Sequence, residues 1–430
     1  MRVLFTTVVE KAHLYAQVPL AWALRAAGHQ VRIACPPDLA DEITSTGLTA
    51  LPAGAPSGRA EKREQYRRWI EESDPVRLEL LHWHRELRIG EPHPERLSYD
   101  HLHGVLSVWV SVFQNIAPQE LMDDLVLAAR SWRPHLVVWD PMMFAGPVAA
   151  RACGAAHARL LPGFDVVARL WRAHRAALER RPPRLREDPL AEWLGAAARR
   201  YGGGFDEELV LGQWTLDPMP SSMRLPADVH YVPLRHVPYN GPAVVPRWLR
   251  DPPGGPRVCL TAGVSQEETG APAAFSAEAL LDAVAGVDAQ VVATLDGATL
   301  DGARPGTARR LPGNVRPVGF VPLNELLPTC AAIVHHGGFG TFQSALAHGV
   351  PQLILPDGMI DNELRADAVE RSGAGLSLRR PGQLAGGLAR TLADPSFARA
   401  AGRLRDEQLA APAPRELVPI LEGLTADHGD

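Results

Sequence analysis

Residues 331–363 (AAIVHHGGFGTFQSALAHGVPQLILPDGMIDNE) constrain the fold of this chain more than any other stretch. The apolar run 331–334 predicts a buried strand, and the pattern over 342–348, which stops at Gly349, predicts a helix. A glycine-rich turn joins the two. This order places the helix N-terminus, with its unpaired N–H groups and partial positive charge, at the mouth of a parallel sheet. A phosphate group is the ligand that such a terminus favours.

The turn itself carries the small and polar residues that an anion site needs. Gly337, Gly338 and Gly340 let the backbone come close to a phosphate, Thr341 offers a hydroxyl, and His336 offers a ring N–H. We therefore predict a phosphate-binding turn here.

The pair His335-His336 could instead bind a metal ion. Adjacent residues on an extended chain point to opposite faces, so a chelating pair is disfavoured and His335 is expected to be buried against the sheet. No cluster of His, Cys, Asp or Glu has metal-ligand spacing, and the sequence holds no DxD pair. We expect no metal site and no cofactor.

The N-terminal end begins a second series of strands and helices. Residues 2–9 predict a buried strand, His13 follows in a short loop, 14–27 predict an amphipathic helix ended by Gly28, and 31–35 predict a second strand. A βαβ unit of this kind implies a parallel, doubly wound sheet. The segment after the first strand lacks the GxGxxG turn, which argues against a nicotinamide or flavin dinucleotide.

Residues 54–120 interrupt this alternation with polar, charged and irregular sequence. We interpret them as an insertion on one face of the sheet, which either lines a pocket for a bulky substrate or covers the core. Regular alternation returns with a helix over 119–131 and a strand over 135–139 that ends at Asp140. The segments 169–181 and 188–201 predict surface helices.

The best domain boundary is the segment 241–256 (GPAVVPRWLRDPPGGP), which is rich in Gly and Pro. We predict an N-terminal domain over 1–240 and a C-terminal domain over 257–430, with the option that the last helices of the second domain pack back on the first. The fold class is α/β: two doubly wound parallel-sheet domains that face each other across a cleft. Ligands are expected at the carboxyl ends of the strands.

Composition excludes several classes of partner. The chain has 430 residues, enough for two or three domains, and a net charge of only −5, which does not suggest a nucleic acid or an anionic membrane as partner. No apolar run has the length of a membrane span, and the N-terminus lacks the features of a signal peptide. Four widely spaced cysteines are typical of buried thiols in a reducing compartment. We expect a cytoplasmic protein.

Several segments of the chain resemble those of one protein family. The motif HHGGFGT with ALAHGVPQLILP, preceded by NVRPVGFVPLNELLP, is similar to the donor-binding region of family 1 nucleotide-sugar glycosyltransferases, which have the GT-B fold. The similarity extends to HLYAQVPLAWALRAAGHQV, WRPHLVVWDPMMFAGP, EDPLAEWL, GQWTLDP, VPYNGPAVVPRWL and RVCLTAGVS, so it covers most of the chain outside about 55–105. The subgroup resembled transfers deoxysugars or aminodeoxysugars from dTDP to macrolide and anthracycline polyketides.

The resemblance implies that the N-terminal domain binds the acceptor and the C-terminal domain binds the nucleotide-sugar donor, and it implies which residues bind the donor. Those implied to hold the pyrophosphate are His336, Gly338, Gly340 and Thr341, with Gly263 and Ser265 nearby. Phe320 and the backbone of Val321 would pack on the base. Asp361 and Asn362 would touch the sugar, although the usual second member of this pair is Gln. Phe339, inside the turn, is a candidate for contact with the sugar or the acceptor.

The resemblance also implies a general base, His13, and a carboxylate that orients it, Asp140. A histidine with a pKa of about 6.5 suits the removal of a proton from an acceptor hydroxyl at neutral pH. A carboxylate on the other ring nitrogen sets the tautomer and stabilises the imidazolium. The alternatives are a solvated loop histidine for His13 and a helix cap for Asp140. Five tryptophans could form an aromatic acceptor box, but most are expected to be core or interface residues, with at most one or two touching the acceptor: Trp109, Trp132, Trp139, Trp171 and Trp214.

The implied function is an inverting glycosyltransferase that moves a deoxysugar, expected to be an aminodeoxysugar, from dTDP to a polyketide hydroxyl in antibiotic biosynthesis. Two alternatives stay open: a nucleotide-sugar epimerase of the same architecture, and a catalytically silent nucleotide-binding subunit. Several members of the subgroup need a helper protein resembling a cytochrome P450, and a homo-oligomer is compatible with the sequence. Neither the sugar nor the aglycone follows from the residues.

Overall fold

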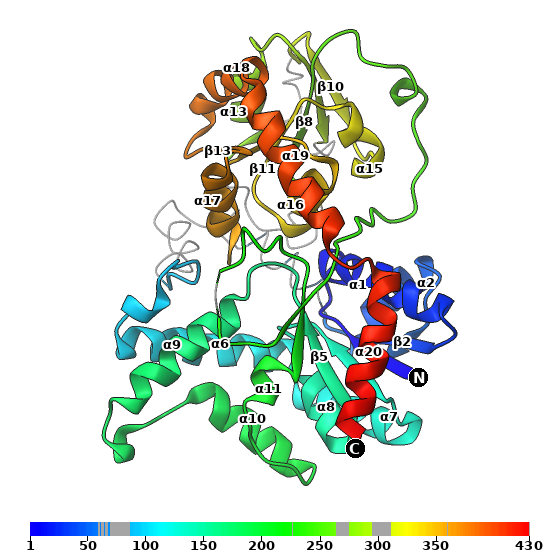
Figure 1. The fold of residues 1–430 in the computed structure, drawn as a ribbon, viewed down its shortest axis with the longest axis vertical. Helices are drawn as coiled ribbons and strands as arrows, with labels where there is room; N and C mark the ends of the chain where they lie inside the picture. Colours follow the sequence, from blue (N-terminus) through cyan, green and yellow to red (C-terminus); the bar gives the residue numbers. More distant parts are fainter. Residues whose placement is uncertain are drawn as a thin grey trace.

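Two parallel β-sheets, one in each half of the chain, organise the protein (Figure 1). The computed structural model describes residues 1–58, 61, 64, 68, 87–225, 227–263, 275–294, 311–358 and 360–429. The N-terminal sheet has the order β3-β2-β1-β4-β5-β6-β7, with strands β1 Arg2–Thr6, β2 Gln30–Cys35, β3 Ala50–Pro52, β4 Leu136–Trp139, β5 Ala156–Leu160, β6 Trp214–Asp217 and β7 Tyr231–Pro233. The C-terminal sheet has the order β10-β9-β8-β11-β12-β13, with strands β8 Arg257–Thr261, β9 Gln290–Thr294, β10 Val315–Val318, β11 Ala332–His335, β12 Gln352–Ile354 and β13 Gly375–Ser377.

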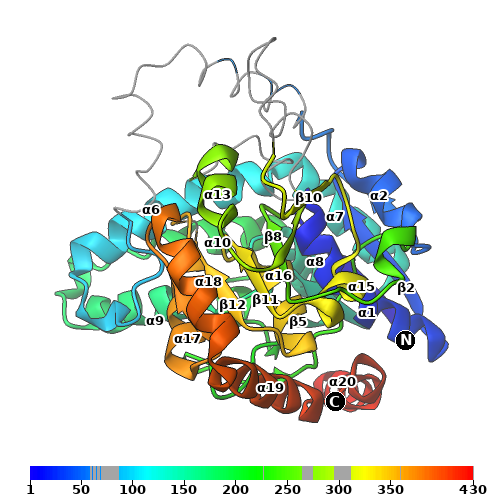
Figure 2. The same cartoon turned by 90° about the horizontal axis from the view of Figure 1, so that it is seen from above.

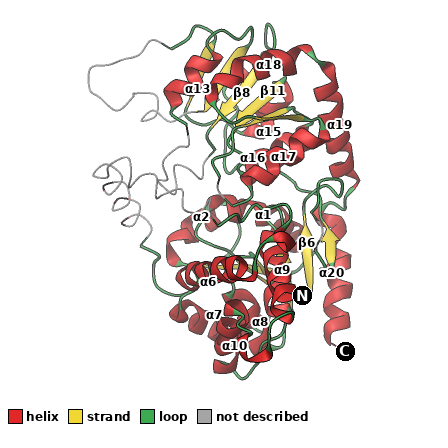
Figure 3. Cartoon of the chain, turned by 90° about the vertical axis from the view of Figure 1, so that its left-hand side faces the viewer, coloured by secondary structure: helices red, strands yellow, loops and turns green. Residues whose placement is uncertain are grey.

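Helices cover both sheets (Figure 3). Those of the N-terminal half are α1 Lys11–Ala26, α2 Ala40–Ser45, α6 Tyr99–Ile116, α7 Gln119–Trp132, α8 Ala145–Cys153, α9 Val166–Glu179, α10 Pro189–Arg200 and α11 Glu208–Leu211. Those of the C-terminal half are α13 Ala277–Val284, α15 Leu323–Leu326, α16 Phe339–His348, α17 Asn362–Ser372, α18 Leu384–Ala393, α19 Pro395–Ala410 and α20 Pro414–Gly429.

The central strands are buried on both faces, as the continuous apolar runs predict. All four residues of β4 are inaccessible to solvent, and the four residues of β11 are at most 2% exposed. Helix α1 packs one apolar side against the N-terminal sheet, where Leu14, Val18 and Leu24 join the core. The hydrophobic effect of these layers holds each half together.

Each sheet reverses its strand order at one point, and both of these points lie where the sequence predicts ligands. In the N-terminal sheet β1 lies between β2 and β4, so the chain switches direction between β1 and β4. In the C-terminal sheet the same switch lies between β8 and β11. Ligands of open α/β sheets bind outside the carboxyl ends of the strands at such a switch point.

Several predicted boundaries are wrong in the N-terminal half. His13 lies in the first turn of α1, not in a loop. The described part of 54–120 includes the 18-residue helix α6, whose residues Leu106 and Phe113 are buried in the main core. The expected surface helix 169–181 is α9, which starts at Val166 and is mostly buried. The remainder of the predicted insertion, chiefly 69–86, lies outside the described residues.

In the C-terminal half the important helix starts earlier than predicted. Helix α16 begins at Phe339, three residues before the predicted start at 342, so Phe339, Gly340 and Thr341 belong to its first turn and not to the loop. Strands β3, β6, β7 and β13 have no predicted counterpart. They are three or four residues long, too short for a periodic pattern to emerge.

The last helix returns to the first domain. Helix α19 runs down one edge of the molecule and α20 continues beside the N-terminal sheet (Figures 2 and 3). Leu417, Val418 and Leu421 of α20 are buried in the same cluster as α1. The C-terminal segment therefore stabilises the N-terminal domain.

Polar contacts join the two halves on the side of α16 and α19. The buried amide of Gln343 in α16 donates to the carbonyl of Pro218 at 3.2 Å and accepts from Gln408 of α19 at 2.6 Å. Glu407 accepts hydrogen bonds from the hydroxyls of Ser221 and Ser222. The relative placement of the halves is thus determined by specific hydrogen bonds as well as by the chain crossovers.

Candidate functional site

A histidine and a carboxylate meet at the switch point of the N-terminal sheet. His13 follows β1 and Asp140 follows β4, and these strands are direct neighbours, with Thr6 opposite Trp139. The Nδ1 atom of His13 and the Oδ2 atom of Asp140 lie 2.5 Å apart. Because a carboxylate only accepts, Nδ1 carries the proton and Nε2 is left for the acceptor. The His13 side chain is 15% exposed, so it remains accessible.

Opposing effects set the pKa of His13. Burial lowers it, but the charge and hydrogen bond of Asp140, together with the charge of Glu10, more than compensate and raise the pKa of His13 from 6.5 to about 9. The ring is therefore a stronger base than a free histidine. The nearest carboxylate besides Asp140 is Glu10, whose Oε2 lies 3.8 Å from Nε2, beyond hydrogen-bond distance.

Asp140 has a second contact that orients its carboxylate. Its Oδ1 atom accepts from the backbone N–H of Met142 at 2.9 Å, while Oδ2 faces His13. Helix α8 begins five residues after Asp140 and has no side-chain cap. Asp140 thus stabilises the turn after β4 but does not cap the helix.

The phosphate turn lies at the switch point of the other sheet. Helix α16 starts after Gly338, and no side chain among the described residues caps it, so the first N–H groups have no such partner there and suit a ligand. The buried Nδ1 atom of His336 has no hydrogen-bond partner among the described residues. Burial lowers the pKa of His336. A neutral ring with an unsatisfied nitrogen beside a helix N-terminus is suited to an oxyanion.

Two glycines make room for the His336 ring. A Cβ atom at Gly338 would lie 2.7 Å from Nε2 of His336, and one at Gly263 would lie 3.0 Å from Cε1. Gly263 also has a φ of +73°, which other residues rarely adopt. Thr341 is buried, and its Oγ1 faces Gly263. The turn after β8 and the turn after β11 therefore lie side by side and bring Gly263, His336, Gly338 and Thr341 together. Gly340 is exposed in the first turn of α16.

His335 supports the turn from the opposite side of the strand. It is 2% exposed, and burial lowers its pKa to about 3, so it is neutral. Its Nε2 atom lies 2.9 Å from Oε1 of Gln352, and Nδ1 accepts from the N–H of Gly337 at 3.0 Å. In the described part of the chain, no three His, Cys, Asp or Glu side chains are grouped as metal ligands.

The residues expected at the base of the nucleotide lie at the end of β10. Phe320 is 55% exposed, which is unusual for a large aromatic ring and leaves it free to pack on a planar ligand. Val321 is buried at 3%. Ser265 lies outside the described residues.

Asp361 and Asn362 both accept hydrogen bonds from Arg365, a residue that was not predicted from the sequence. The Oδ1 atom of Asp361 accepts from Nη2 of Arg365 at 2.5 Å, and Oδ2 accepts from the backbone N–H of Phe164, in the N-terminal domain, at 2.9 Å. Asn362 accepts from Arg365 at 2.7 Å and donates to Asp357 at the same distance. The i, i+4 spacing of Asp361 and Arg365 on a helix was the available signal.

Phe339 is less available than expected. It is 8% exposed, its ring meets His236 edge-on at 5.4 Å between centroids, and the guanidinium of Arg365 lies 5.7 Å from the ring. Trp109, Trp139, Trp171 and Trp214 are core residues, each less than 9% exposed, and Trp132 is partly buried against the core that contains Trp109.

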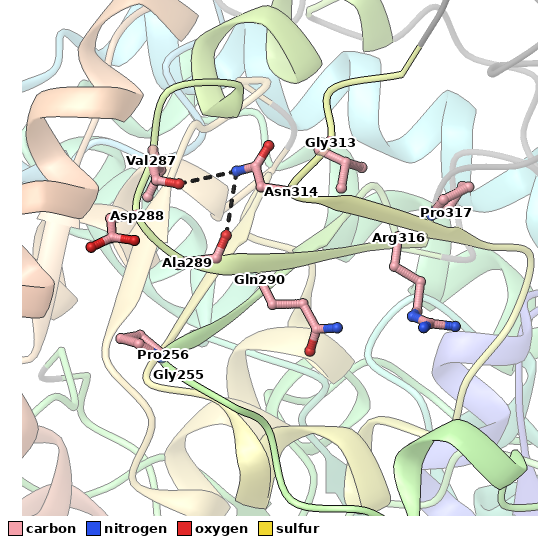
Figure 4. A pocket seen from close by; sticks show the side chains of 11 residues that line it. Gly255, Pro256, Val287, Asp288, Ala289, Gln290, Gly313, Asn314, Arg316 and Pro317 are labelled. Atoms are coloured by element: carbon pink, nitrogen blue, oxygen red, sulfur yellow. Dashed lines mark hydrogen bonds between the residues drawn. The ribbon is translucent and has the colours of Figure 1, made fainter.

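A hollow of about 730 Å³ lies elsewhere, where strands β8, β9 and β10 begin (Figure 4). Asn314 and Arg316 line it, and Nδ2 of Asn314 donates to the carbonyls of Val287 and Ala289. Because these strands point their carboxyl ends away from it, the hollow is on the opposite edge of the sheet from the phosphate turn. It is not the donor site.

Comparison with known proteins identifies the family. Residues 22–263 match the family described as erythromycin biosynthesis protein CIII-like, N-terminal domain, and residues 278–424 match the C-terminal domain of the same name. The chain belongs to this glycosyltransferase family. The resemblance to family 1 glycosyltransferases is thereby confirmed.

Relatives of this family cover the whole chain. Aclacinomycin-T 2-deoxy-L-fucose transferase of Streptomyces galilaeus is 48% identical, over 100% of this chain and 97% of the relative. The 3-alpha-mycarosylerythronolide B desosaminyl transferase of Saccharopolyspora erythraea is 44% identical, over 99% of each. The crystal structure of glycosyltransferase VinC in complex with dTDP has a TM-score of 0.86 and 39% identity, and covers 99% of this chain and 100% of that chain. This match confirms the GT-B fold.

Proposed function

We propose that this glycosyltransferase moves a deoxysugar from dTDP to a hydroxyl of a polyketide aglycone, with inversion at the anomeric carbon. One observation carries the proposal: a His–Asp pair and a phosphate turn occupy the switch points of two facing sheets. The names of the relatives supply the classes of sugar and acceptor. Both neutral and amino sugars occur among these names, so the amino group stays a proposal.

The chemistry uses groups of this chain. His13 removes the proton from the acceptor hydroxyl as that oxygen attacks the anomeric carbon, and Asp140 stabilises the imidazolium that forms. The bond from the sugar to the diphosphate breaks, and the electron pair leaves with the diphosphate. The N–H groups of α16, His336 and Thr341 stabilise the charge of the leaving group. Inversion follows from this single displacement.

We further propose that transfer needs no metal ion. The helix N-terminus and His336 supply the electrostatic stabilisation that a divalent cation supplies in other transferases. Activity is expected to persist after dialysis against EDTA. Loss of activity that magnesium restores would contradict this proposal.

The donor assignment is tested by ligand binding. A ligand present at 100 times its Kd stabilises the native state by about 2.7 kcal/mol. We expect dTDP to raise the Tm more than UDP, GDP or ADP at equal concentration. Incubation with a dTDP-deoxysugar and a polyketide aglycone, followed by mass spectrometry, tests transfer, and isomerisation of the donor without acceptor would indicate an epimerase instead.

A partner protein is a separate proposal. From the family resemblance we propose that a cytochrome P450-like helper binds the N-terminal domain and that the enzyme works in the cytoplasm. None of the helices in the described part of the chain has the length and apolarity of a membrane-spanning helix. Full activity of the purified chain without a helper would dismiss the partner.

A further inference from the structure

A buried arginine connects three parts of the donor site. Arg365 lies on α17 and is 5% exposed. Its Nη2 atom donates to Oδ1 of Asp361 at 2.5 Å, and its Nη1 atom donates to the Gly337 carbonyl at 2.6 Å and to Oδ1 of Asn362 at 2.7 Å. The guanidinium therefore holds the phosphate turn and the Asp361-Asn362 pair in one arrangement.

The Asp361–Arg365 ion pair packs against the backbone of the N-terminal domain. Oδ2 of Asp361 accepts from the N–H of Phe164, in the loop after β5. A Cβ atom at Gly163 would lie 2.5 Å from both Nη2 of Arg365 and Oδ2 of Asp361. The absence of a side chain at Gly163 is thus what allows the ion pair to reach the Phe164 backbone. Both carboxylate oxygens of Asp361 are engaged before any sugar binds.

Stability alone does not account for this arrangement. A buried ion pair gains little over apolar side chains of the same volume, because both charges lose their hydration. Arg365 also keeps a buried Nε atom without a hydrogen-bond partner among the described residues. An ion pair that contacts the phosphate turn through Arg365 and the other domain through Asp361 is better explained by the geometry it imposes.

We propose that Arg365 is a positioning residue for sugar transfer, which fixes the phosphate turn of the donor domain against the Gly163-Phe164 loop of the acceptor domain through Asp361. The inference rests on the proposed function, since it names the group that sets the separation between the donor and His13. It assigns Asp361 to the contact between domains in addition to the sugar contact expected from the family.

The charge of Arg365 should affect the pH profile of the enzyme, which a purely structural role would leave unchanged. The charged groups that face His13 are Asp140 and Glu10 from the N-terminal domain and Arg365 from the C-terminal domain. The two carboxylates raise the pKa of His13 and the guanidinium lowers it. Removal of the positive charge should therefore move the ascending limb of the pH profile, which reports the deprotonation of His13, to higher pH. Lys at this position should keep the limb where it is.

The experiment compares Arg365→Gln, Arg365→Lys and Gly163→Ala with a control, Arg371→Gln. Arg371 lies on the same helix and is exposed. We expect Arg365→Gln to lower kcat about 100-fold, because a displacement of the donor by about 1 Å can have an effect of this size. We also expect it to move the ascending limb of the kcat/KM profile to higher pH. Arg365→Lys keeps the positive charge, so it should leave the ascending limb at the pH of the wild type and retain part of kcat. Gly163→Ala should lower kcat, because its added Cβ would overlap Nη2 of Arg365 and Oδ2 of Asp361 and disturb the same arrangement from the other domain.

Two outcomes would overturn the proposal. One is an Arg365→Gln enzyme that loses Tm but keeps kcat and the pH limb of the wild type. The other is a Gly163→Ala enzyme with unchanged kcat. If the wild type transfers no sugar, the proposed function fails by itself. NMR titration of His13 in the ligand-free wild type and Arg365→Gln variant then tests whether Arg365 lies close enough to His13 to lower its pKa. An upward shift in Arg365→Gln supports the placement of Arg365, and an unchanged titration rejects it.

Discussion

At the scale of single residues, the His13–Asp140 pair decides whether the chain can act as a base catalyst. A carboxylate 2.5 Å from Nδ1 leaves Nε2 as the site of proton transfer. We expect His13→Ala to lower kcat by about 10²- to 10⁴-fold, the usual contribution of a general base. Binding of dTDP should be unchanged, because the phosphate turn lies in the other domain. A turnover close to that of the wild type would remove His13 from the mechanism.

The pH dependence follows from the raised pKa of His13. The base must be neutral to accept a proton, so log kcat/KM should rise with pH up to about 9. Asp140→Asn removes the charge that raises the pKa, so the limb should move to lower pH while kcat falls. A wild-type limb near 6.5 that is insensitive to this substitution would contradict the assignment.

The same pKa has a consequence for stability, with a defined sign. The folded state binds the proton of His13 more tightly than the unfolded state, whose value is near 6.5. This contribution is fully present below pH 6.5 and is lost as the pH rises through about 9. Urea denaturation should therefore show a decline over this range that is smaller in Asp140→Asn.

At the scale of elements, the site depends on how closely the backbone at Gly338 approaches the ring of His336 within the turn after β11. We expect Gly338→Ala to weaken dTDP binding by about tenfold or more, because its methyl group would overlap Nε2 of His336 and displace the ring from a hydrogen bond to the ligand. Gly386→Ala is the matched control: it lies in α18 with no atom near the added Cβ, and should stabilise the protein slightly. Calorimetric titration measures both, and equal affinities in the two variants would exclude the role of the turn.

The element scale also shows why some predictions from sequence were right. The strands β1, β4 and β11 are largely apolar runs, and burial on both faces makes such runs recognisable. His13 was misplaced in a loop because its helix starts without a side-chain cap, at Lys11, and its first turn is polar. Helix α6 was obscured because it starts after a polar stretch, although Ser98 caps it through the N–H of His101.

At the scale of the whole molecule, α20 ties the C-terminus to the first domain. We expect Leu417→Ala, in the core shared with α1, to lower the free energy of unfolding by about 2–5 kcal/mol. Leu409→Ala, at a position 49% exposed on α19, should change it by about 0.5 kcal/mol or less. Urea denaturation at constant pH measures both. A small effect at Leu417 would mean that the crossover of α20 is not part of the N-terminal core.

The sequence by itself determined the class of fold and the chemistry of each half. Apolar runs followed by glycine turns specify parallel strands and a phosphate turn, because these patterns are local. Only the tertiary structure decided which groups meet. The 2.5 Å contact of His13 with Asp140 spans 127 positions, and the contact of Phe164 with Asp361 spans 197. Arg365 was missed for the same reason: its burial results from the packing of two domains, which no local pattern encodes.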